Sequence, residues 1–371
     1  MKIIFVGGGT SGHINPALNI ANYIRKIEPD SKILYVGSKN GIEKKMAKEE
    51  GFEFKGITTS GFSRSFSLNS FKKNIITIFN IFKSAKESKK ILNEFLPDVC
   101  LGTGGYVCGS FLKQASKMGI PFFLQEQNSI PGLTTKILSK KAKKIFLGSC
   151  EAKKYLPGSN CVFTGNPIRS DFFYFARNKI NSNLFNCLEI KEIARKILCL
   201  NNSETIILSF GGSLGAPAIN NVILEVMKTK KYTHVHGYGR NNKSFIENFE
   251  KLNINKNKIK IAEYIKNMNI YMAASDLVIC RAGAMTLSEL TAVCKPAILV
   301  PSPNVAENHQ FYNAVDYAKN NIASVIEESK ISGKILIQEI EKNLKKNFLG
   351  DKLFKINNTC EKIYKIIKND S

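Results

Sequence analysis

Short runs of apolar and β-branched residues alternate along this chain with longer amphipathic segments. In the first half the runs lie at residues 2–6, 33–36, 99–101, 122–125 and 144–147. In the second half the pattern starts again, with runs at 205–210, 232–236, 277–280, 297–300 and 323–326, and the Lys-rich segment from Ile337 has a helical pattern. Alternation of this kind predicts βαβ units and a parallel sheet.

The same pattern predicts two domains. It changes around residues 162–167, and a polar, Asn-rich stretch follows at 178–186. We therefore predict an N-terminal Rossmann-like domain over 1–165, a C-terminal Rossmann-like domain over 166–340, and a C-terminal helix over 341–371 that could pack back on the N-terminal domain. The expected fold class is α/β, with two Rossmann-like domains facing each other across a cleft.

Each domain is predicted to open on a strand that runs into a glycine-rich turn. The first turn, Gly7-Gly8-Gly9-Thr10-Ser11-Gly12, has the spacing of a dinucleotide-binding turn. A dehydrogenase would carry an acidic residue after its second strand, where this chain has Gly37-Ser38, so NAD binding is disfavoured. Glycines let backbone N–H groups approach a ligand at a helix start. His13 follows directly, which favours a catalytic or substrate-binding role over a structural one.

A further cluster of glycines follows the strand at 99–101. Gly102, Gly104, Gly105 and Gly109 are more than a tight turn requires, although loop flexibility is the alternative explanation. The next strand closes with four polar residues, Gln125-Glu126-Gln127-Asn128, of which a turn explains one or two. Because ligands bind beyond the carboxyl ends of parallel strands, we expect these side chains at a ligand site.

The C-terminal glycine turn, Gly211-Gly212-Ser213-Leu214-Gly215-Ala216, places backbone donors and a hydroxyl at a helix start. This arrangement suits a diphosphate, and each fixed donor aimed at developing charge is worth roughly 3 kcal/mol of transition-state stabilisation. The sequence contains no Asp-x-Asp pair to hold a metal–diphosphate, so backbone amides and cations are expected to stabilise the leaving group without a metal ion. A P-loop motif is absent too, which disfavours a P-loop NTPase.

Residues 280–290 have the pattern of a strand end, a small-residue turn and a helix from near Met285. Glu289 then lies about one turn into the helix, facing the predicted cleft, where its carboxylate can accept hydrogen bonds from both vicinal hydroxyls of a ribose. The alternative is that it complements the helix dipole, which is worth about 0.3–1 kcal/mol. Together with Pro301 and the later Asn308-His309-Gln310 segment, the pattern favours the binding role.

Composition and charge narrow the choice of partner. The 54 Lys and Arg residues exceed the 30 Asp and Glu residues by 24, a surplus that attracts polyanions, although a chain rich in Lys, Asn and Ile throughout explains part of it. The basic residues are dispersed and no nucleic-acid motif occurs, so nucleic acid is not an expected partner. The nine cysteines are scattered, without a Cys-x-x-Cys pair or a nearby His, which predicts reduced thiols in a cytoplasm. The sequence shows no signal-peptide pattern, and no apolar stretch approaches the ~20 residues of a spanning helix, so a membrane role would be peripheral.

Taken in order, the motifs resemble those of the MurG family, the peptidoglycan N-acetylglucosaminyltransferases of the glycosyltransferase family 28 type. The motifs are Gly-Gly-Thr-Ser-Gly-His, Gly-Gly-Tyr-Val, Glu-Gln-Asn, Gly-Asn-Pro-Ile-Arg, Gly-Gly-Ser-Leu-Gly-Ala, Arg-Ala-Gly-Ala-Met-Thr-Leu-Ser-Glu and His-Gln-x-x-Asn-Ala, and they run from Gly7 to Ala314. The resemblance implies the GT-B fold and inverting, metal-independent transfer of N-acetylglucosamine from UDP-N-acetylglucosamine to lipid I, undecaprenyl-diphosphate-N-acetylmuramoyl-pentapeptide. No cofactor is implied.

The resemblance also implies which residues form the two substrate sites. By motif, the donor site would include Thr10, Ser11, Gly12, Asn128, Arg169, Ser213, Ile265, Gly283, Ala284, Met285, Thr286, Leu287, Ser288, Glu289, and Gln310 or its neighbour His309. Ile265 would meet the uracil through its backbone, Glu289 the ribose and Gln310 the sugar hydroxyls. The acceptor side would include His13, Tyr106, Glu126 and Asn128.

Two departures from the family pattern occur. Ser11 stands where many members have glycine, which the turn should tolerate, and His309 precedes Gln310 where some members have two glutamines. Inversion in one displacement needs a general base for the acceptor hydroxyl, which contributes typically ~10²–10⁴-fold. His13 is the first candidate because an imidazole can be neutral near pH 7, and Glu126 is the second.

The segment 71–92 is Lys-rich and amphipathic, with apolar residues at Ile75, Ile76, Ile78, Phe79, Ile81 and Phe82. Core packing is one explanation. The resemblance suggests another, in which an apolar patch ringed by Lys72, Lys73 and Lys83 docks on anionic lipid at the cytoplasmic face of the cell membrane. Among enzymes, a nonhydrolysing UDP-N-acetylglucosamine 2-epimerase of similar architecture is the nearest alternative.

Overall fold

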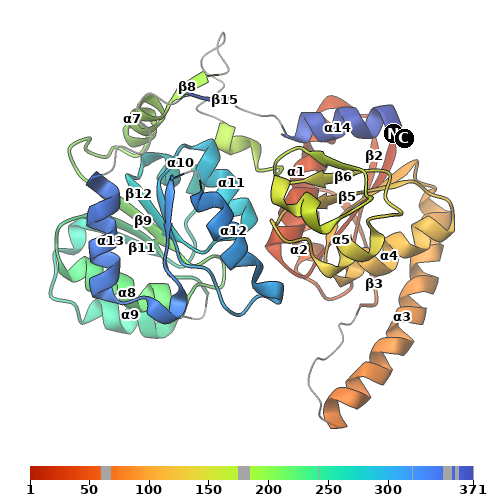
Figure 1. Ribbon diagram of the computed structural model, residues 1–371, viewed down its shortest axis with the longest axis horizontal. Helices are drawn as coiled ribbons and strands as arrows, with labels where there is room; N and C mark the ends of the chain where they lie inside the picture. The colour runs from red at the N-terminus through yellow and green to blue at the C-terminus, as the bar shows by residue number, and fades with distance from the viewer. Residues whose placement is uncertain are drawn as a thin grey trace. The chain divides into compact units, whose positions relative to one another are not determined.

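The computed structural model describes residues 1–59, 68–173, 184–240, 242–319, 321–345, 353–355 and 359–370. The chain divides into two compact units (Figure 1). One unit comprises Met1–Arg169 together with Asn358–Ser371, and the other comprises Ser170–Asn357. Each unit has its own parallel sheet and its own hydrophobic core, as the repeated pattern in the sequence predicts.

The first unit is built on a seven-stranded parallel sheet with the order β3-β2-β1-β4-β5-β6-β7. The strands are β1 (Lys2–Gly7), β2 (Lys32–Ser38), β3 (Glu53–Ile57), β4 (Val99–Gly104), β5 (Phe122–Glu126), β6 (Ile145–Leu147) and β7 (Cys161–Phe163). The helices are α1 (Ser11–Ile27), α2 (Glu43–Glu49), α3 (Leu68–Phe95), α4 (Tyr106–Lys117), α5 (Leu133–Leu138) and α14 (Thr359–Asp370). The sequence did not predict β3 and β7, because β3 alternates exposed and half-buried residues at the sheet edge and β7 is three residues long.

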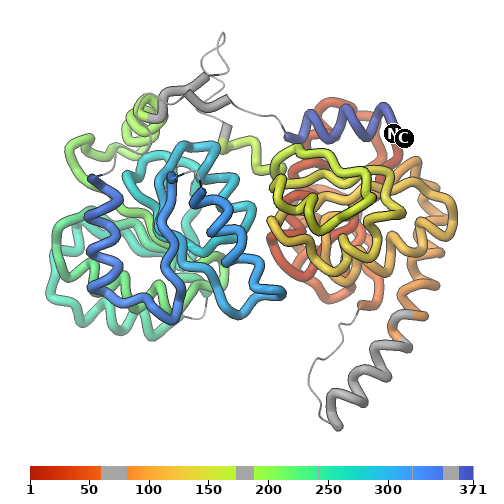
Figure 2. Tube along the Cα trace, in the orientation of Figure 1, coloured from red at the N-terminus to blue at the C-terminus, as the bar shows by residue number. Residues whose placement is uncertain are grey.

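Both faces of this sheet are covered, which explains why its central strands are continuously apolar. On one face Ile3 and Phe5 of β1 belong to the same core as the apolar residues of α1 and α14. On the other face Ile4 and Val6 belong to the core that α4 and the C-terminal part of α3 complete. Figure 2 shows the C-terminal helix α14 lying on this unit.

The second unit has a six-stranded parallel sheet with the order β11-β10-β9-β12-β13-β14. The strands are β9 (Ile206–Phe210), β10 (Thr233–Gly237), β11 (Ile259–Ala262), β12 (Leu277–Cys280), β13 (Ala297–Leu299) and β14 (Ala323–Val325). The helices are α7 (Cys187–Ile197), α8 (Pro217–Lys228), α9 (Lys243–Glu250), α10 (Met268–Ala274), α11 (Ala284–Ala292), α12 (His309–Ala318) and α13 (Gly333–Lys345). The sequence did not predict β11, nor a short antiparallel pair formed by β8 (Leu184–Asn186) with β15 (Leu353–Lys355).

The sequence pattern predicted a single C-terminal helix over 341–371, and this prediction was wrong. Helix α13 ends at Lys345 within the second unit, β15 follows, and the separate helix α14 belongs to the first unit. Both helices are amphipathic and Lys-rich, so the hydrophobic pattern alone does not separate them.

The strand order locates the ligand-binding edge of each sheet. In each sheet the strand order changes direction between the first strand along the chain and the neighbour that comes later in the sequence. These pairs are β1 with β4 and β9 with β12. Ligands of such sheets bind outside the carboxyl ends of the strands at this switch point. The four predicted turns follow these four strands.

Candidate functional site

The first glycine turn leaves the amino end of α1 open. Thr10 is the N-cap residue with an extended backbone (φ −141°, ψ 154°), and α1 has no acidic residue in its first turn. Thr10 and Ser11 are exposed, and Gly12 is half-buried. The first N–H groups of a helix have no partner within the helix and carry a partial positive charge. The turn therefore suits an anionic group or a set of sugar hydroxyls.

His13 is held by backbone groups on both sides of the switch point. Its Nδ1 lies 3.1 Å from the carbonyl oxygen of Gly8, and its own carbonyl accepts a 2.6 Å hydrogen bond from the Thr103 hydroxyl. A Cβ atom on Gly104 would lie 2.6 Å from the ring's Cδ2, so glycine at 104 makes room for the imidazole. Because a carbonyl oxygen only accepts, this hydrogen bond requires a proton on Nδ1, and in the neutral ring the lone pair is then on Nε2. In this tautomer His13 can receive a proton at Nε2.

Helix α4 begins at the turn that borders His13. Gly105 is its N-cap with φ 86°, and its carbonyl accepts a hydrogen bond of 3.2 Å from Thr134. Tyr106 is the first residue of α4 and is 59% exposed, so its phenol is accessible at the same edge of the sheet. The structure thus brings His13 and Tyr106 to adjoining turns.

Glu126 lies at the end of β5 and is only 3% exposed. Its Oε1 accepts hydrogen bonds from the backbone and side-chain amides of Asn128 (3.1 and 3.2 Å), and its Oε2 accepts from Gly132 N (3.0 Å) and Thr135 Oγ1 (2.6 Å). Four donors therefore engage the two oxygens. This carboxylate shapes the loop that carries Asn128.

The neighbouring polar residues of the same segment are also buried. The amide of Gln125 donates to Asn166 (3.0 Å), and that of Gln127 donates to the carbonyl of Thr103 (2.9 Å). The expectation that all four polar residues at the end of β5 lie at a ligand site was therefore wrong for Gln125 and Gln127, whose side chains bond neighbouring segments. Asn128 is half-buried, and Arg169, the last residue before the second unit, is exposed.

In the second unit, the glycine turn after β9 leads into α8, which has Pro217 at its start and no acidic residue in its first turn. Ser213 is exposed. The turn is locked to the segment after β10, because a Cβ atom on Gly215 would lie 2.2 Å from the carbonyl oxygen of Tyr238. Asn242 adds a hydrogen bond of 3.0 Å to the carbonyl of Leu214. The backbone N–H groups of the 211–216 turn are therefore held in place by contacts within the protein.

A buried hydrogen-bond chain supports this turn from within. His236, fully buried in β10, bonds Ser209 through Nδ1 (2.8 Å) and Asn220 through Nε2 (3.1 Å), and Asn220 also donates to Tyr238 O (3.0 Å). Burial lowers the pKa of His236 to about 3 and that of nearby His234 to about 4, so both rings are neutral at physiological pH. Asn220 and His236 were not predicted, because nothing in the sequence links them to the turn.

Glu289 lies in α11, which starts at Ala284 after its N-cap Gly283. The structure places Gly283, Ala284, Met285, Thr286, Ser288 and Glu289 at half-buried positions. Leu287 differs, since its side chain is 6% exposed and belongs to the interior, so only its backbone could contact a ligand. Asn313 of α12 donates to the carbonyl of Ala282 (3.4 Å) and ties α12 to this turn.

His309 and Gln310 begin α12 and have different partners. Nδ1 of His309 donates to the carbonyl of Ala306 (2.9 Å), while Oε1 of Gln310 accepts from the backbone N–H of Ser302 (2.9 Å). The second bond orients the carboxamide of Gln310 and leaves its NH₂ group as a donor. Both side chains are half-buried.

Ile265 is 5% exposed and lines a pocket of about 280 Å³ beside β10 and β11. The other lining residues are Val235, Lys260, Ala262, Tyr264, Lys266, Asn267 and Tyr271. The ammonium of Lys260 lies 4.7 Å from the centroid of the Tyr271 ring and bonds its hydroxyl. Tyr264 is 62% exposed, so an aromatic surface is available next to Ile265.

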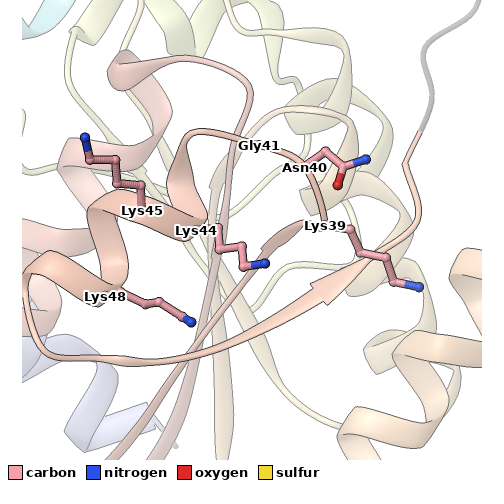
Figure 3. Close-up of a pocket in the computed structure, with 6 residues that line it drawn as sticks. All are labelled: Lys39, Asn40, Gly41, Lys44, Lys45 and Lys48. Atoms are coloured by element: carbon pink, nitrogen blue, oxygen red, sulfur yellow. The ribbon is translucent and has the colours of Figure 1, made fainter.

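A basic pocket of about 460 Å³ lies in the first unit where β2 meets α2 (Figure 3). It is lined by Lys39, Asn40, Gly41, Lys44, Lys45 and Lys48. Lys39 is paired with Glu87 (2.6 Å), whereas Lys44 and Lys48 extend to the same side of α2.

For the predicted membrane segment, the side chains of 71–79 and 81 lie outside the described residues, and Phe82 is 72% exposed. Within the described ranges no helix has the length and apolar character to cross a bilayer. Nor do the described residues bring three His, Cys, Asp or Glu side chains together in a metal-binding group.

Two Rossmann-like units, each with open helix starts and glycine turns at its switch point, define the GT-B class of glycosyltransferase architecture. A crystal structure of Acinetobacter baumannii MurG matches with a TM-score of 0.73 at 22% identity, covering 99% of each chain. A UDP-GlcNAc 2-epimerase from Neisseria meningitidis, bound to UDP-GlcNAc, matches with a TM-score of 0.63 at 15% identity, covering 100% of both chains. At these identities the likeness concerns the fold.

Sequence comparison identifies the family of the chain, which the fold alone does not. Residues 3–147 match the N-terminal domain and residues 206–367 the C-terminal domain of glycosyltransferase family 28. The UDP-N-acetylglucosamine–N-acetylmuramyl-(pentapeptide) pyrophosphoryl-undecaprenol N-acetylglucosamine transferase of Acetivibrio thermocellus is 40% identical over 381 residues, covering 100% of this chain and 98% of that protein. The chain therefore belongs to the MurG branch of glycosyltransferase family 28.

Proposed function

We propose that this chain transfers N-acetylglucosamine from UDP-N-acetylglucosamine to lipid I and so forms lipid II for peptidoglycan, in support of cell wall biogenesis, cell shape and cell division. The observation that carries the proposal is the full-length identity of 40% to a transferase of that name, combined with an imidazole at the switch point of the first unit whose Nδ1 bonds the carbonyl of Gly8. The transferase relatives make the epimerase alternative the weaker one.

In the proposed reaction the acceptor hydroxyl attacks the anomeric carbon as the bond to UDP breaks on the opposite face. The hydroxyl proton moves to Nε2 of His13, whose Nδ1–H bond to Gly8 holds the required tautomer. Glu126 is assigned the task of orienting Asn128 rather than that of the base, because four donors already engage its oxygens. Tyr106 would contact the acceptor.

The donor would be held by the second unit. The fixed donors of the 211–216 turn and the start of α8 would stabilise the departing diphosphate, without a metal ion. Glu289 would bind the ribose, Ile265 the uracil and Gln310 the sugar. Helix α3 and its lysines would meet an anionic membrane surface at the cytoplasmic face of the cell membrane.

The test is one assay with UDP-N-acetylglucosamine and a soluble lipid I analogue, run with and without a chelator and read by mass spectrometry. Transfer predicts a product heavier than the acceptor by one N-acetylglucosamine, formed equally in both conditions. Conversion of the donor to its 2-epimer without acceptor consumption would overturn the proposal. Loss of transfer on chelation would overturn only the metal-independent part.

A further inference from the structure

Glu43 is a fully buried carboxylate that none of the roles above uses. It is the first residue of α2 and is 0% exposed. Its Oε1 accepts a 2.8 Å hydrogen bond from Ser38 N, and its Oε2 lies 3.4 Å from Gly9 N. The carboxylate therefore sits between the turn after β2 and the glycine turn after β1. Burying a charge is costly unless hydrogen bonds compensate it, so such a group needs an explanation.

Three glycines surround this one side chain. A Cβ atom on Gly8 would lie 2.3 Å from Oε1 of Glu43, one on Gly41 would lie 2.2 Å from the same atom, and one on Gly37 would lie 2.4 Å from Cγ. Real Cβ atoms essentially never make contacts this short, so a side chain at any of these three positions would displace the side chain of Glu43. Two of these glycines lie far from Gly8 in the sequence, and Glu43 is what they share.

The contact with Gly8 leads directly to His13. The carbonyl of Gly8 is the group that Nδ1 of His13 bonds at 3.1 Å. The other side of Gly8 is also confined. The backbone nitrogen of Gly8 donates to the carbonyl of Gly104 at 3.4 Å, and a Cβ atom on Gly105 would lie 2.4 Å from the carbonyl oxygen of Gly8. Gly8 is thus held between Glu43 and the turn after β4.

We propose that Glu43 is a positioning residue for His13. Its carboxylate fixes the Gly8–Gly9 segment so that the Gly8 carbonyl faces Nδ1 of the imidazole, which keeps the proton on Nδ1 and the lone pair on Nε2. This inference rests on the proposed role of His13 as general base. The simpler explanation is that Glu43 only stabilises the start of α2 through the helix dipole, which would affect stability and nothing else.

The test substitutes Glu43→Gln and reads the tautomer of His13 by nitrogen-15 NMR of the substrate-free protein. Glutamine keeps the shape of the side chain but has only one acceptor oxygen. It cannot accept from both Ser38 N and Gly9 N, so the Gly8–Gly9 segment should reorient. The sequence has four histidines, so a His13→Gln spectrum assigns the signal. We expect the Nδ1–H tautomer of His13 to be lost, and kcat to fall about tenfold or more while KM for UDP-N-acetylglucosamine changes by less than about twofold.

Glu49→Gln is the matched control, because Glu49 lies on the same helix, is mostly exposed and pairs with Lys45 at 3.7 Å. It should change neither the tautomer nor kcat. Glu43→Asp retains the carboxylate and should recover part of both readouts, and it serves if Glu43→Gln does not fold. A Glu43 variant that is less stable but keeps the Nδ1–H tautomer and normal kcat would overturn the proposal. Wild-type protein without transferase activity would overturn the proposed function, whereas the tautomer result would still test the link between Glu43 and His13.

Discussion

Gly239 and Gly215 touch through their backbones, since a Cβ atom on Gly239 would lie 2.1 Å from the amide nitrogen of Gly215. Gly239 also has φ +78°, a conformation that other residues rarely adopt. This contact connects the segment after β10 to the glycine turn after β9, where the diphosphate is proposed to bind.

Gly239→Ala should therefore displace that turn. We expect the affinity for UDP to fall about tenfold or more, because a hydrogen bond to a charged group contributes about 1.5–3 kcal/mol and about 1.4 kcal/mol corresponds to a tenfold change in Kd. Titration calorimetry with UDP measures the effect. Gly119→Ala is the control, since Gly119 has a similar φ of +72° but no atom within 4 Å of the added Cβ. Equal loss in both variants would assign the effect to backbone strain alone.

His13→Ala should lower kcat by about 10²–10⁴-fold, the usual contribution of a general base. UDP binding should stay unchanged, because the residues proposed to hold the nucleotide belong to the second unit. Steady-state kinetics and calorimetry separate the two effects. Turnover close to that of the wild type, with the donor still bound, would exclude His13 as the base.

Glu289→Gln should weaken binding of UDP more than binding of 2′-deoxy-UDP, which keeps only the 3′-hydroxyl. Hydrogen bonds to a charged group contribute about 1.5–3 kcal/mol, so removing the charge should cost roughly ten- to hundredfold in Kd for the ribonucleotide. In the wild type, 2′-deoxy-UDP should already bind more weakly. If the substitution weakens both ligands equally, Glu289 does not contact the 2′-hydroxyl, and if it weakens neither, Glu289 does not contact the ribose.

Glu126→Ala should unfold the loop that follows β5 rather than remove a base. It would leave the donors of Asn128, Gly132 and Thr135 without their acceptor, at a cost of about 2–4 kcal/mol in the free energy of unfolding. Thr135→Val removes one donor and should cost less. Urea denaturation checks both variants. An Ala variant as stable as the wild type but inactive would return Glu126 to the list of candidate bases.

The second unit should lose stability in acid because of His234 and His236. Burial lowers their pKa values to about 4 and about 3, below the ordinary value of 6.5, so the unfolded chain binds protons first as the pH falls. Their contribution is complete above pH 6.5 and is lost between pH 6.5 and the folded values, amounting to about 3 kcal/mol for His234.

His234→Phe should flatten this pH dependence at little cost at pH 8, because neither ring nitrogen of His234 has a hydrogen-bond partner among the residues that the structure describes. His236→Phe should destabilise at every pH, since it breaks the bonds to Ser209 and Asn220. Unfolding measured by circular dichroism from pH 4 to 8 distinguishes the two. An unchanged slope in His234→Phe would contradict the assignment.

The sequence predicted the glycine turns of the site, but not the buried side chains that hold these turns in place. Glycines after β1, β4 and β9 are visible as motifs because they are contiguous. Glu43 was missed because Gly8, Gly37 and Gly41 converge on it only once β1 and β2 pair. Gln125 and Gln127 were assigned to a ligand because a polar run at a strand end has the same appearance whether it faces a substrate or bonds neighbouring loops. Leu287 was assigned to the donor site because it lies in a family motif, but its side chain is buried, so only its backbone could contact a ligand.

Helix α14 has a consequence for biosynthesis. Ile363, Tyr364 and Ile367 fill the core beside α1, yet the ribosome makes them after the entire second unit. Domains commonly fold as they emerge, amino end first. Here the amino-terminal unit keeps an apolar surface uncovered until α14 has been synthesised, and during that interval the nascent chain would be a substrate for chaperones.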